Sequence, residues 1–277
     1  MTTLRVLLHV AAQRDYELHS LDFSTDFLQG SLHEEIWLRR PPGFTGTTLT
    51  ALGFAPSTTD PSLFLRTNTS LPPFYVLVYV DDLVFATADT EAQALAKSFR
   101  ASASGAPRHS PLLCLLVTRS QLHLRTSPIL ARYVAPGRHQ PEHWEAAKRV
   151  LRYLCSTSSM GLVLGGWGPV VLTGHADASW VNDLATQRTS QGYTFSLGSG
   201  SVSSRSTRSS SVLSSSCEAE IYVGAMAAQE LRWLTYLLTD LGERPCLSPV
   251  LYVDNKAMIA LCQEHTLEHR TKHISLR

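Results

Sequence analysis

The sequence contains no uninterrupted apolar run of the roughly 20 residues that a membrane-spanning helix requires. Its first residues, MTTLRVLLHVAAQ, hold a short apolar patch, little of the basic region of a signal peptide and a poor cleavage site. It also lacks CxxC pairs, and its five cysteines are scattered, which is typical of a reducing compartment. We therefore expect no membrane span, no disulfide framework and an intracellular location, cytoplasmic or nuclear.

Charged residues are few, at 17%, whereas 44% of the residues are hydrophobic, and this composition allows a packed core. The net charge of +1 is unevenly distributed. Residues 100–153 hold 9 Lys or Arg against 2 Asp or Glu, while the net charge is −5 over residues 1–99 and −1 over residues 154–277. Two interpretations stay open: a basic track for a polyanion such as nucleic acid, or a solvated basic face.

The first hundred residues predict a small α+β region. We expect a short helix at 4–12, a strand at 18–24, a strand pair at 74–88 and a helix at 89–101. The segment 39–61 is dense in Pro, Gly and Thr and is interpreted as a loop.

The second half predicts an amphipathic helix followed by a mixed α/β domain. The helix at 140–157 has Pro141 in its first turn and an apolar face. Residues 199–216 carry 11 serines, typical of a linker, but their alternation around Val202 favours a solvent-exposed strand. The expected order is strand 170–178, strand 192–197, strand 201–207, helix 215–241, strand 249–255 and a helix to about 264.

Two adjacent carboxylates interrupt the apolar stretch FYVLVYVDDLVFATAD at residues 74–89. Burying two charges side by side is costly unless a cation binds them. At a hairpin tip, Asp81 and Asp82 can both approach Mg²⁺, and Asp22 at the end of a neighbouring strand can add a third oxygen ligand. Asp26 lies beyond that strand and is less suited. A plain acidic turn is the simpler interpretation of an isolated pair.

A second set of acids follows the later strands. Asp177 and Asp254 are expected at strand ends and Glu220 in the first turns of a helix, so the three can converge. Such a cluster can hold two metal ions about 3.5–4 Å apart for phosphodiester hydrolysis. Ser215 and Glu218 form a capping box, which leaves Glu220, about 200° further round the helix, to face the sheet. Three unrelated surface acids would give the same pattern.

Seven segments together resemble the reverse transcriptase–ribonuclease H region of copia-type retrotransposon polyproteins. They occur in the order of that family and make up about half of the chain. The segments are ELHSLDFSTDFLQGSLHEEIWLRRPPGF, LVYVDDLVFA, EHWEAAKRVLRYLCSTSSMGLVL, HADASWVNDLATQRTSQGYTFSLGSGSVSSRS, LSSSCEAEIYVGAMAAQELRWL, LYVDNKAMIAL and HRTKHI.

The resemblance implies that the chain has two parts. A truncated polymerase-palm remnant of α+β type would span residues 1–101, and a basic linker with a connection helix would span residues 102–168. A ribonuclease-H-like α/β domain with a mixed sheet would then span residues 169–277. The expected activity is Mg²⁺-dependent hydrolysis of RNA in an RNA–DNA hybrid, with two metal ions and Mn²⁺ as a possible substitute.

The resemblance also assigns the acids. Asp22, Asp81 and Asp82 match the polymerase acids, and Asp177, Glu220 and Asp254 match the nuclease acids as catalytic and metal-binding residues.

The sequence departs from the family at three places. A box like YGLKQAPR and most of the fingers region are missing before YVDD, the segment after YVDD is short, and Ser275 stands where the family has Asp. We therefore expect polymerase activity to be lost from a decayed copy.

Three alternatives stay open. The sequence HTLEH at 265–269 formally fits an inverted zinc-protease motif, with His265 and His269 as ligands and Glu268 as base. The chain can instead be a non-catalytic nucleic-acid-binding relic of a retroelement, which the basic segment 100–153 favours. Finally, the shortened polymerase half can fail to fold. If the nuclease works, His269 or His273 is a candidate for assisting proton transfer.

Overall fold

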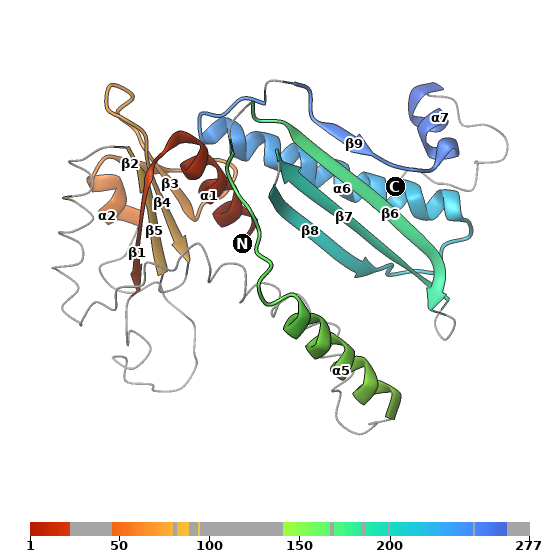
Figure 1. The fold of residues 1–277 in the computed structure, drawn as a ribbon. Helices are drawn as coiled ribbons and strands as arrows, with labels where there is room; N and C mark the ends of the chain where they lie inside the picture. Colours follow the sequence, from red (N-terminus) through yellow and green to blue (C-terminus); the bar gives the residue numbers. More distant parts are fainter. Residues whose placement is uncertain are drawn as a thin grey trace, which may run out of the picture. The chain divides into compact units, whose positions relative to one another are not determined.

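The fold was analysed in a computed structural model, which describes residues 1–22, 46–79, 82–88, 94, 141–166, 169–183, 187–198, 200–245 and 247–264. By their contacts, residues 1–105 and 164–277 form one compact unit, and residues 106–163 form a second. The architecture is α+β, with one antiparallel sheet and one mixed sheet (Figure 1). This agrees with the expected α+β character and mixed sheet, while the palm remnant and the three-part division of the chain stay predictions.

The first sheet is antiparallel throughout, in the order β1-β5-β4-β3-β2. Because successive side chains on a strand point to opposite faces, its residues divide between two hydrophobic clusters. Leu63, Tyr75 and Leu77 belong to the larger core. Phe64, Phe74, Phe85 and their neighbours form a separate aromatic cluster. The strands are β1 Glu17–Asp22, β2 Phe54–Pro56, β3 Leu63–Arg66, β4 Phe74–Tyr79 and β5 Asp82–Thr87.

The prediction of a loop over 39–61 was wrong from residue 46 onward. This part contains helix α2, Gly46–Ala51, and strand β2, and β3 follows soon after. Leu49 and Phe54 are buried in the aromatic cluster, where Phe54 meets Phe74 edge to face at 5.1 Å between ring centroids. Tertiary packing thus orders a segment whose composition alone indicates a loop.

Helix α1, Thr2–Arg14, is longer than expected and contacts both β5 of the first sheet and β8 of the second. Val6, Leu7, Val10 and Ala11 are fully or almost fully buried in the larger core. The helix ends at Asp15, which adopts a left-handed conformation with φ 55° and donates its backbone N–H to the carbonyl of Ala11.

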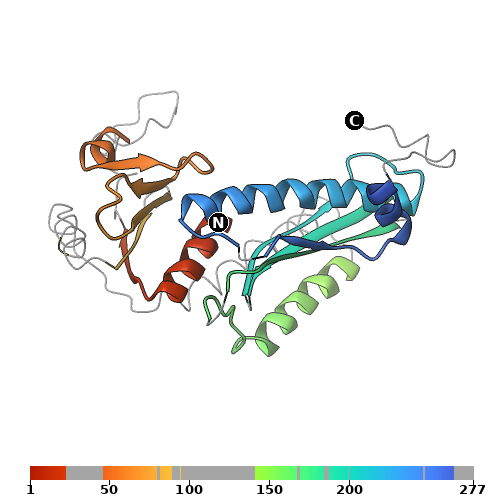
Figure 2. The ribbon, with the colours of Figure 1, turned by 90° about the horizontal axis from the view of Figure 1, so that it is seen from above.

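The second sheet has the order β8-β7-β6-β9. β6, β7 and β8 are antiparallel neighbours, whereas β9 pairs parallel to β6. Helix α6 runs along one face of this sheet (Figure 2). The serine-rich segment does form the predicted strand. The elements are β6 Leu172–Asp183, β7 Arg188–Leu197, β8 Gly200–Arg208, α6 Ser216–Asp240, β9 Val250–Tyr252 and α7 Lys256–Glu264.

The start of α6 is fixed by Ser215, as predicted. The Ser215 hydroxyl accepts a hydrogen bond from the backbone N–H of Glu218 at 3.1 Å. The Glu218 carboxylate accepts from the backbone N–H and hydroxyl of Ser214, at 2.7 and 2.6 Å. These bonds reach one residue further back than in the expected capping box. Glu218 therefore has a structural role.

Several polar contacts join the first sheet and α1 to the end of α6 within the same unit. Arg14 makes a two-point contact with the nearly buried Glu243, at 2.6 and 3.0 Å. The Tyr75 hydroxyl donates to the carbonyl of Leu241 at 2.7 Å, and Ser57 donates to Asp240 at 2.5 Å. The two sheets thus share one core, so this part of the N-terminal region is not an independent appendage.

Buried His9 should make the stability of this unit depend on pH. Its Nδ1 accepts the backbone N–H of Gly165 at 3.0 Å, so the ring is neutral there. Burial lowers its pKa from 6.5, and the nearby charge of Glu243 partly opposes this. Because the unfolded chain takes up a proton first as the pH falls, stability is fully present above about pH 6.5 and declines below it.

The control is His9→Asn, which keeps an acceptor near the position of Nδ1 and does not titrate. We expect wild type to lose stability between pH 7 and 5.5 more steeply than His9→Asn, by at most about 1.4 kcal/mol per pH unit. Urea unfolding followed by circular dichroism measures both slopes. Equal slopes would show that His9 is not held neutral.

Helix α5, Pro141–Ser156, belongs to the second unit and confirms the helix predicted at 140–157. Lys148 and Arg152 lie 2.5 and 4.0 Å from the carboxylate of Glu145. The helix predicted at 89–101 lies outside the described residues except for position 94. Across the described part of the chain, no helix has both the length and the apolar character to span a membrane.

Candidate metal centre

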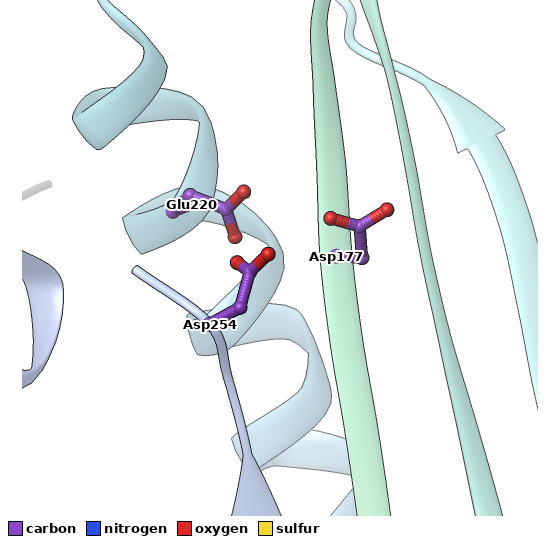
Figure 3. Close-up of side chains that lie close together, drawn as sticks. All are labelled: Asp177, Glu220 and Asp254. Atoms are coloured by element: carbon purple, nitrogen blue, oxygen red, sulfur yellow. The ribbon is translucent and has the colours of Figure 1, made fainter. Parts of the chain in front are cut away.

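Three carboxylates come together at one end of the β6–β9 pair. One oxygen each from Asp177, Glu220 and Asp254 lies within 4.8 Å of the others. Figure 3 shows their side chains converging from β6, the first turns of α6 and the segment after β9. The sequence predicted this convergence, and it is the one group of three or more such side chains found among the described residues.

The register of the sheet explains how two of these acids meet. His175 on β6 is the partner of Tyr252 on the parallel strand β9. Asp177 and Asp254 each follow two residues later, so they lie on the same side and at the same level. The expectation that Asp177 ends its strand was wrong, because β6 continues to Asp183 and Asp177 pairs with Gly192 of β7. Asp254 follows the end of β9 by two residues.

Glu220 supplies the buried member of the cluster. Its side chain is 5% exposed, whereas Asp177 and Asp254 are exposed. Oε1 accepts the backbone N–H of Ala178 at 3.3 Å, and Oε2 is buried without a hydrogen-bond partner among the described residues. Burial raises the pKa of Glu220, the Ala178 bond opposes this, and the charges of Asp254 and Asp177 raise it further. A cation would reverse these penalties.

The donor set fits a hard divalent cation. All three groups offer carboxylate oxygens, which Mg²⁺ and Mn²⁺ prefer over softer ligands. A cation would also satisfy the unpartnered Oε2 of Glu220, and an unpaired buried acceptor costs about 1–3 kcal/mol. The geometry therefore fits a metal centre with Asp177, Glu220 and Asp254 as its ligands.

The structure describes two of the three acids that match the polymerase, Asp22 and Asp82. The backbone of Asp22 at the end of β1 lies opposite Asp82, the first residue of β5, and Asp82 is also the partner of Tyr79 on β4. The Asp82 side chain is exposed. Asp81 lies outside the described residues. The metal-binding role of Asp22, Asp81 and Asp82 stays a prediction.

The remaining candidates lie in segments that the structure does not describe. Asp26 falls in 23–45. Ser275 and the possible zinc or proton-transfer residues fall in 265–277, namely His265, Glu268, His269 and His273.

Two aromatic residues beside the acids were missed by the sequence analysis. The rings of His175 and Tyr252 stack at 5.0 Å between centroids with an interplanar angle of 19°. Each precedes an acid of the cluster by two residues, so each lies on the same side of its strand. The two-residue spacing from each acid was the only sequence signal for this pair. It indicates that the two rings are neighbours only once the pairing of β6 with β9 is known.

Comparison with known proteins gives the chain its relatives. No protein-family model matches it. The retrovirus-related Pol polyprotein from transposon RE2 of Arabidopsis thaliana is 29% identical over 371 aligned positions that include 99% of this chain. The corresponding polyprotein from transposon TNT 1-94 of Nicotiana tabacum is 25% identical over all of this chain. The chain is a homologue of the retrovirus-related Pol polyproteins of copia-type transposons.

This Pol-related chain corresponds to only a part of those proteins. It spans about a quarter of their length, 25% of the RE2 polyprotein and 28% of the TNT 1-94 polyprotein. The 371 aligned positions with RE2 exceed the 277 residues of this chain by 94, so at least that many positions of the relative have no counterpart here. The homologues support a retrotransposon-derived protein.

A further relative matches only about a third of this chain. The secreted RxLR effector protein 161 of Plasmopara viticola is 45% identical over 95 residues, which make up 34% of this chain and 67% of that protein. Its name describes that protein alone.

Proposed function

We propose that the C-terminal region of this Pol-related chain is a ribonuclease-H-like nuclease that hydrolyses RNA in RNA–DNA hybrids with Mg²⁺. Asp177, Glu220 and Asp254 would hold the metal as a two-ion site, in which Mn²⁺ can replace Mg²⁺. The observation that carries the proposal is the convergence of the three carboxylates around the unpartnered oxygen of Glu220.

The fold supports this assignment. Three antiparallel strands, a long helix, a parallel strand and a helix are compatible with a ribonuclease-H-like domain. The homologous polyproteins support nucleic acid as the substrate class. A divalent cation, when bound, supplies positive charge that stabilises the phosphodiester oxygens during hydrolysis. The protein's own part is to hold the three carboxylates at a fixed spacing on β6, α6 and the end of β9.

We further propose that the first sheet is a polymerase-palm remnant without polymerase activity. Asp22 and Asp82 at the adjacent ends of β1 and β5 support a palm origin. The fingers segment missing before YVDD supports the loss of polymerization, because template and nucleotide then lack a binding platform. The proposed location is intracellular, cytoplasmic or nuclear.

The test is cleavage of a labelled RNA strand annealed to DNA, in the presence of Mg²⁺. We expect wild type to cut the RNA, and Asp177→Asn to reduce the rate at least about a hundredfold because a ligand is lost while the fold is kept. Cleavage that persists at the wild-type rate in Asp177→Asn would show that the RNA is cut without this site and would contradict the proposal. The folding of both proteins is compared by circular dichroism.

The second candidate function is a non-catalytic nucleic-acid-binding relic. The basic residues Lys148, Arg149 and Arg152 on α5 favour it, since they suit a phosphate backbone. A folded protein that binds the hybrid but does not cut it would support this candidate and remove the nuclease assignment.

A further inference from the structure

The four-stranded sheet has a polar face that carries one acid of the metal centre. Along β6, buried Leu172, Gly174 and Ala176 alternate with exposed His175 and Asp177. We call the exposed side of β6, with the residues that pair to it on β9, β7 and β8, the outer face. Asp177 therefore belongs both to the metal centre and to this face.

The stacked pair of His175 and Tyr252 lies on the outer face directly beside the acids. Tyr252 is 53% exposed, although its ring already packs on His175. The two rings, stacked 5.0 Å apart, form an aromatic platform beside the carboxylates. An exposed aromatic pair of this kind is the type of contact that gains most when a ligand covers it.

Next to the stacked pair, the outer face has a hollow over β6, β7 and β8. Gly192 of β7 lies directly between Asp177 of β6 and Ser206 of β8 in the sheet register. The hollow has a volume of about 430 Å³, and Gly192 is part of its lining. Its lining includes the hydroxyl-bearing residues Ser179, Ser190, Thr194 and Ser206.

We propose that the outer face positions the cleaved RNA strand, with the Tyr252–His175 pair packed against a ribose next to the scissile phosphate and the Gly192 hollow binding the sugar–phosphate oxygens. This inference rests on the proposed nuclease function and names how its substrate is held. His175 and Asp177 both line the hollow, and Asp177 follows His175 by two residues on the same side of β6. A strand that crosses the platform and the hollow therefore passes Asp177 of the metal centre.

The chemistry of the hollow favours a ribose over a bare phosphate. Hydroxyl groups both donate and accept hydrogen bonds, which matches the 2′-hydroxyl of RNA. The 2′-hydroxyl also distinguishes RNA from DNA. The neighbouring carboxylate of Asp177 repels an isolated anion but can accept a bond from a sugar hydroxyl. The hollow is therefore expected to contribute discrimination between RNA and DNA.

The first test measures binding without cleavage. Equilibrium binding of a fluorescein-labelled RNA–DNA hybrid is followed by anisotropy in EDTA at low salt, for wild type, Tyr252→Ala and Tyr236→Ala. Tyr236 has the same exposure of 53% but lies on α6, roughly 24 Å along the helix from Glu220. We expect Tyr252→Ala to weaken binding about tenfold, and Tyr236→Ala to bind within twofold of wild type.

The outcomes separate this inference from the proposed function. If wild type binds and cuts the hybrid but Tyr252→Ala binds equally well, the platform is wrong and the nuclease assignment stands. If Tyr252→Ala weakens binding but wild type never cuts, the platform stands and the protein is a binding relic. If wild type does not bind the hybrid, the platform is wrong. Mg²⁺ affinity should be unchanged in Tyr252→Ala, because the substitution removes no carboxylate.

The hollow is tested by Thr194→Val, which removes one hydroxyl and keeps the branched shape suited to a strand. We expect the affinity for the hybrid relative to a DNA duplex of the same sequence to fall about threefold to tenfold. An unchanged ratio would contradict a role of the hollow in recognising ribose.

Discussion

Replacing Glu220 by Gln should abolish hydrolysis and at the same time make the metal-free protein more stable. The rate should fall at least about a hundredfold, because a ligand of the metal is lost at the centre of the cluster. In EDTA, however, the free energy of unfolding should rise by roughly 1 kcal/mol or more. The buried carboxylate carries an oxygen without a partner beside two other carboxylates, and removing its charge relieves that cost.

The opposite signs of these two effects separate a functional site from a structural one. If the carboxylate served stability, its substitution would lower both the cleavage rate and the free energy of unfolding. The matched control is Glu218→Gln, in the same turn of α6. Glu218 bonds to Ser214, so its substitution should leave the rate within about twofold and reduce stability by about 0.5–1.5 kcal/mol. Rates come from the hybrid-cleavage assay, and stabilities come from urea unfolding in EDTA.

Two results would contradict this account. Glu220→Gln could lower the stability of the metal-free protein, which would mean that Oε2 is satisfied in solution and the cluster is not strained. Alternatively, the variant could cut RNA at the wild-type rate, which would place any catalytic site elsewhere.

Replacing Gly174 by Ala should be the most destabilising small substitution in the β6–β7 sheet. Gly174 lies opposite Phe195, and an added Cβ would come within 2.2 Å of Cε1 of that ring. Phe195 is fully buried, so its ring has no free space into which it can move. We expect a loss of about 3 kcal/mol in the free energy of unfolding, at the upper end for overpacking a core.

The matched control is Gly224→Ala on α6. Its added Cβ would come within 2.1 Å of the terminal methyl of Met258, which is a flexible side chain that can turn aside. Alanine also favours a helix interior by up to about 1 kcal/mol over glycine. We therefore expect a change of less than about 1 kcal/mol. Similar losses in the two variants, measured by urea unfolding, would contradict the packing described for Phe195.

The long elements of the fold could be predicted because each carries its own local signal. Ser215 marks the start of α6, and the predicted range 215–241 differs from the structure by one residue at each end. The segments that were missed, α2, β2 and β3, have three to six residues each. They are too short for a periodic pattern, and they are ordered by burying Leu49, Phe54 and Phe64 against the aromatic cluster.

The acids of the candidate site could be predicted individually, but their surroundings could not. Glu220 was separated from Glu218 by the angle between them on a helix, a local property. That Asp177 lies level with Asp254 depends on the pairing of His175 with Tyr252, residues 77 positions apart in the chain. The hollow at Gly192 likewise depends on the register of three strands. Contacts of this kind follow from the fold as a whole.

The measurement that tests the central claim most directly is a calorimetric titration of the folded, nucleic-acid-free protein with Mg²⁺ and with Mn²⁺, for wild type and Glu220→Gln. The account predicts saturable binding of both ions by wild type and a large loss of affinity in Glu220→Gln, with the fold intact by circular dichroism. Wild-type protein that binds neither ion, or a Glu220→Gln variant that binds them as well as wild type does, would contradict the assignment of the three carboxylates as a metal centre.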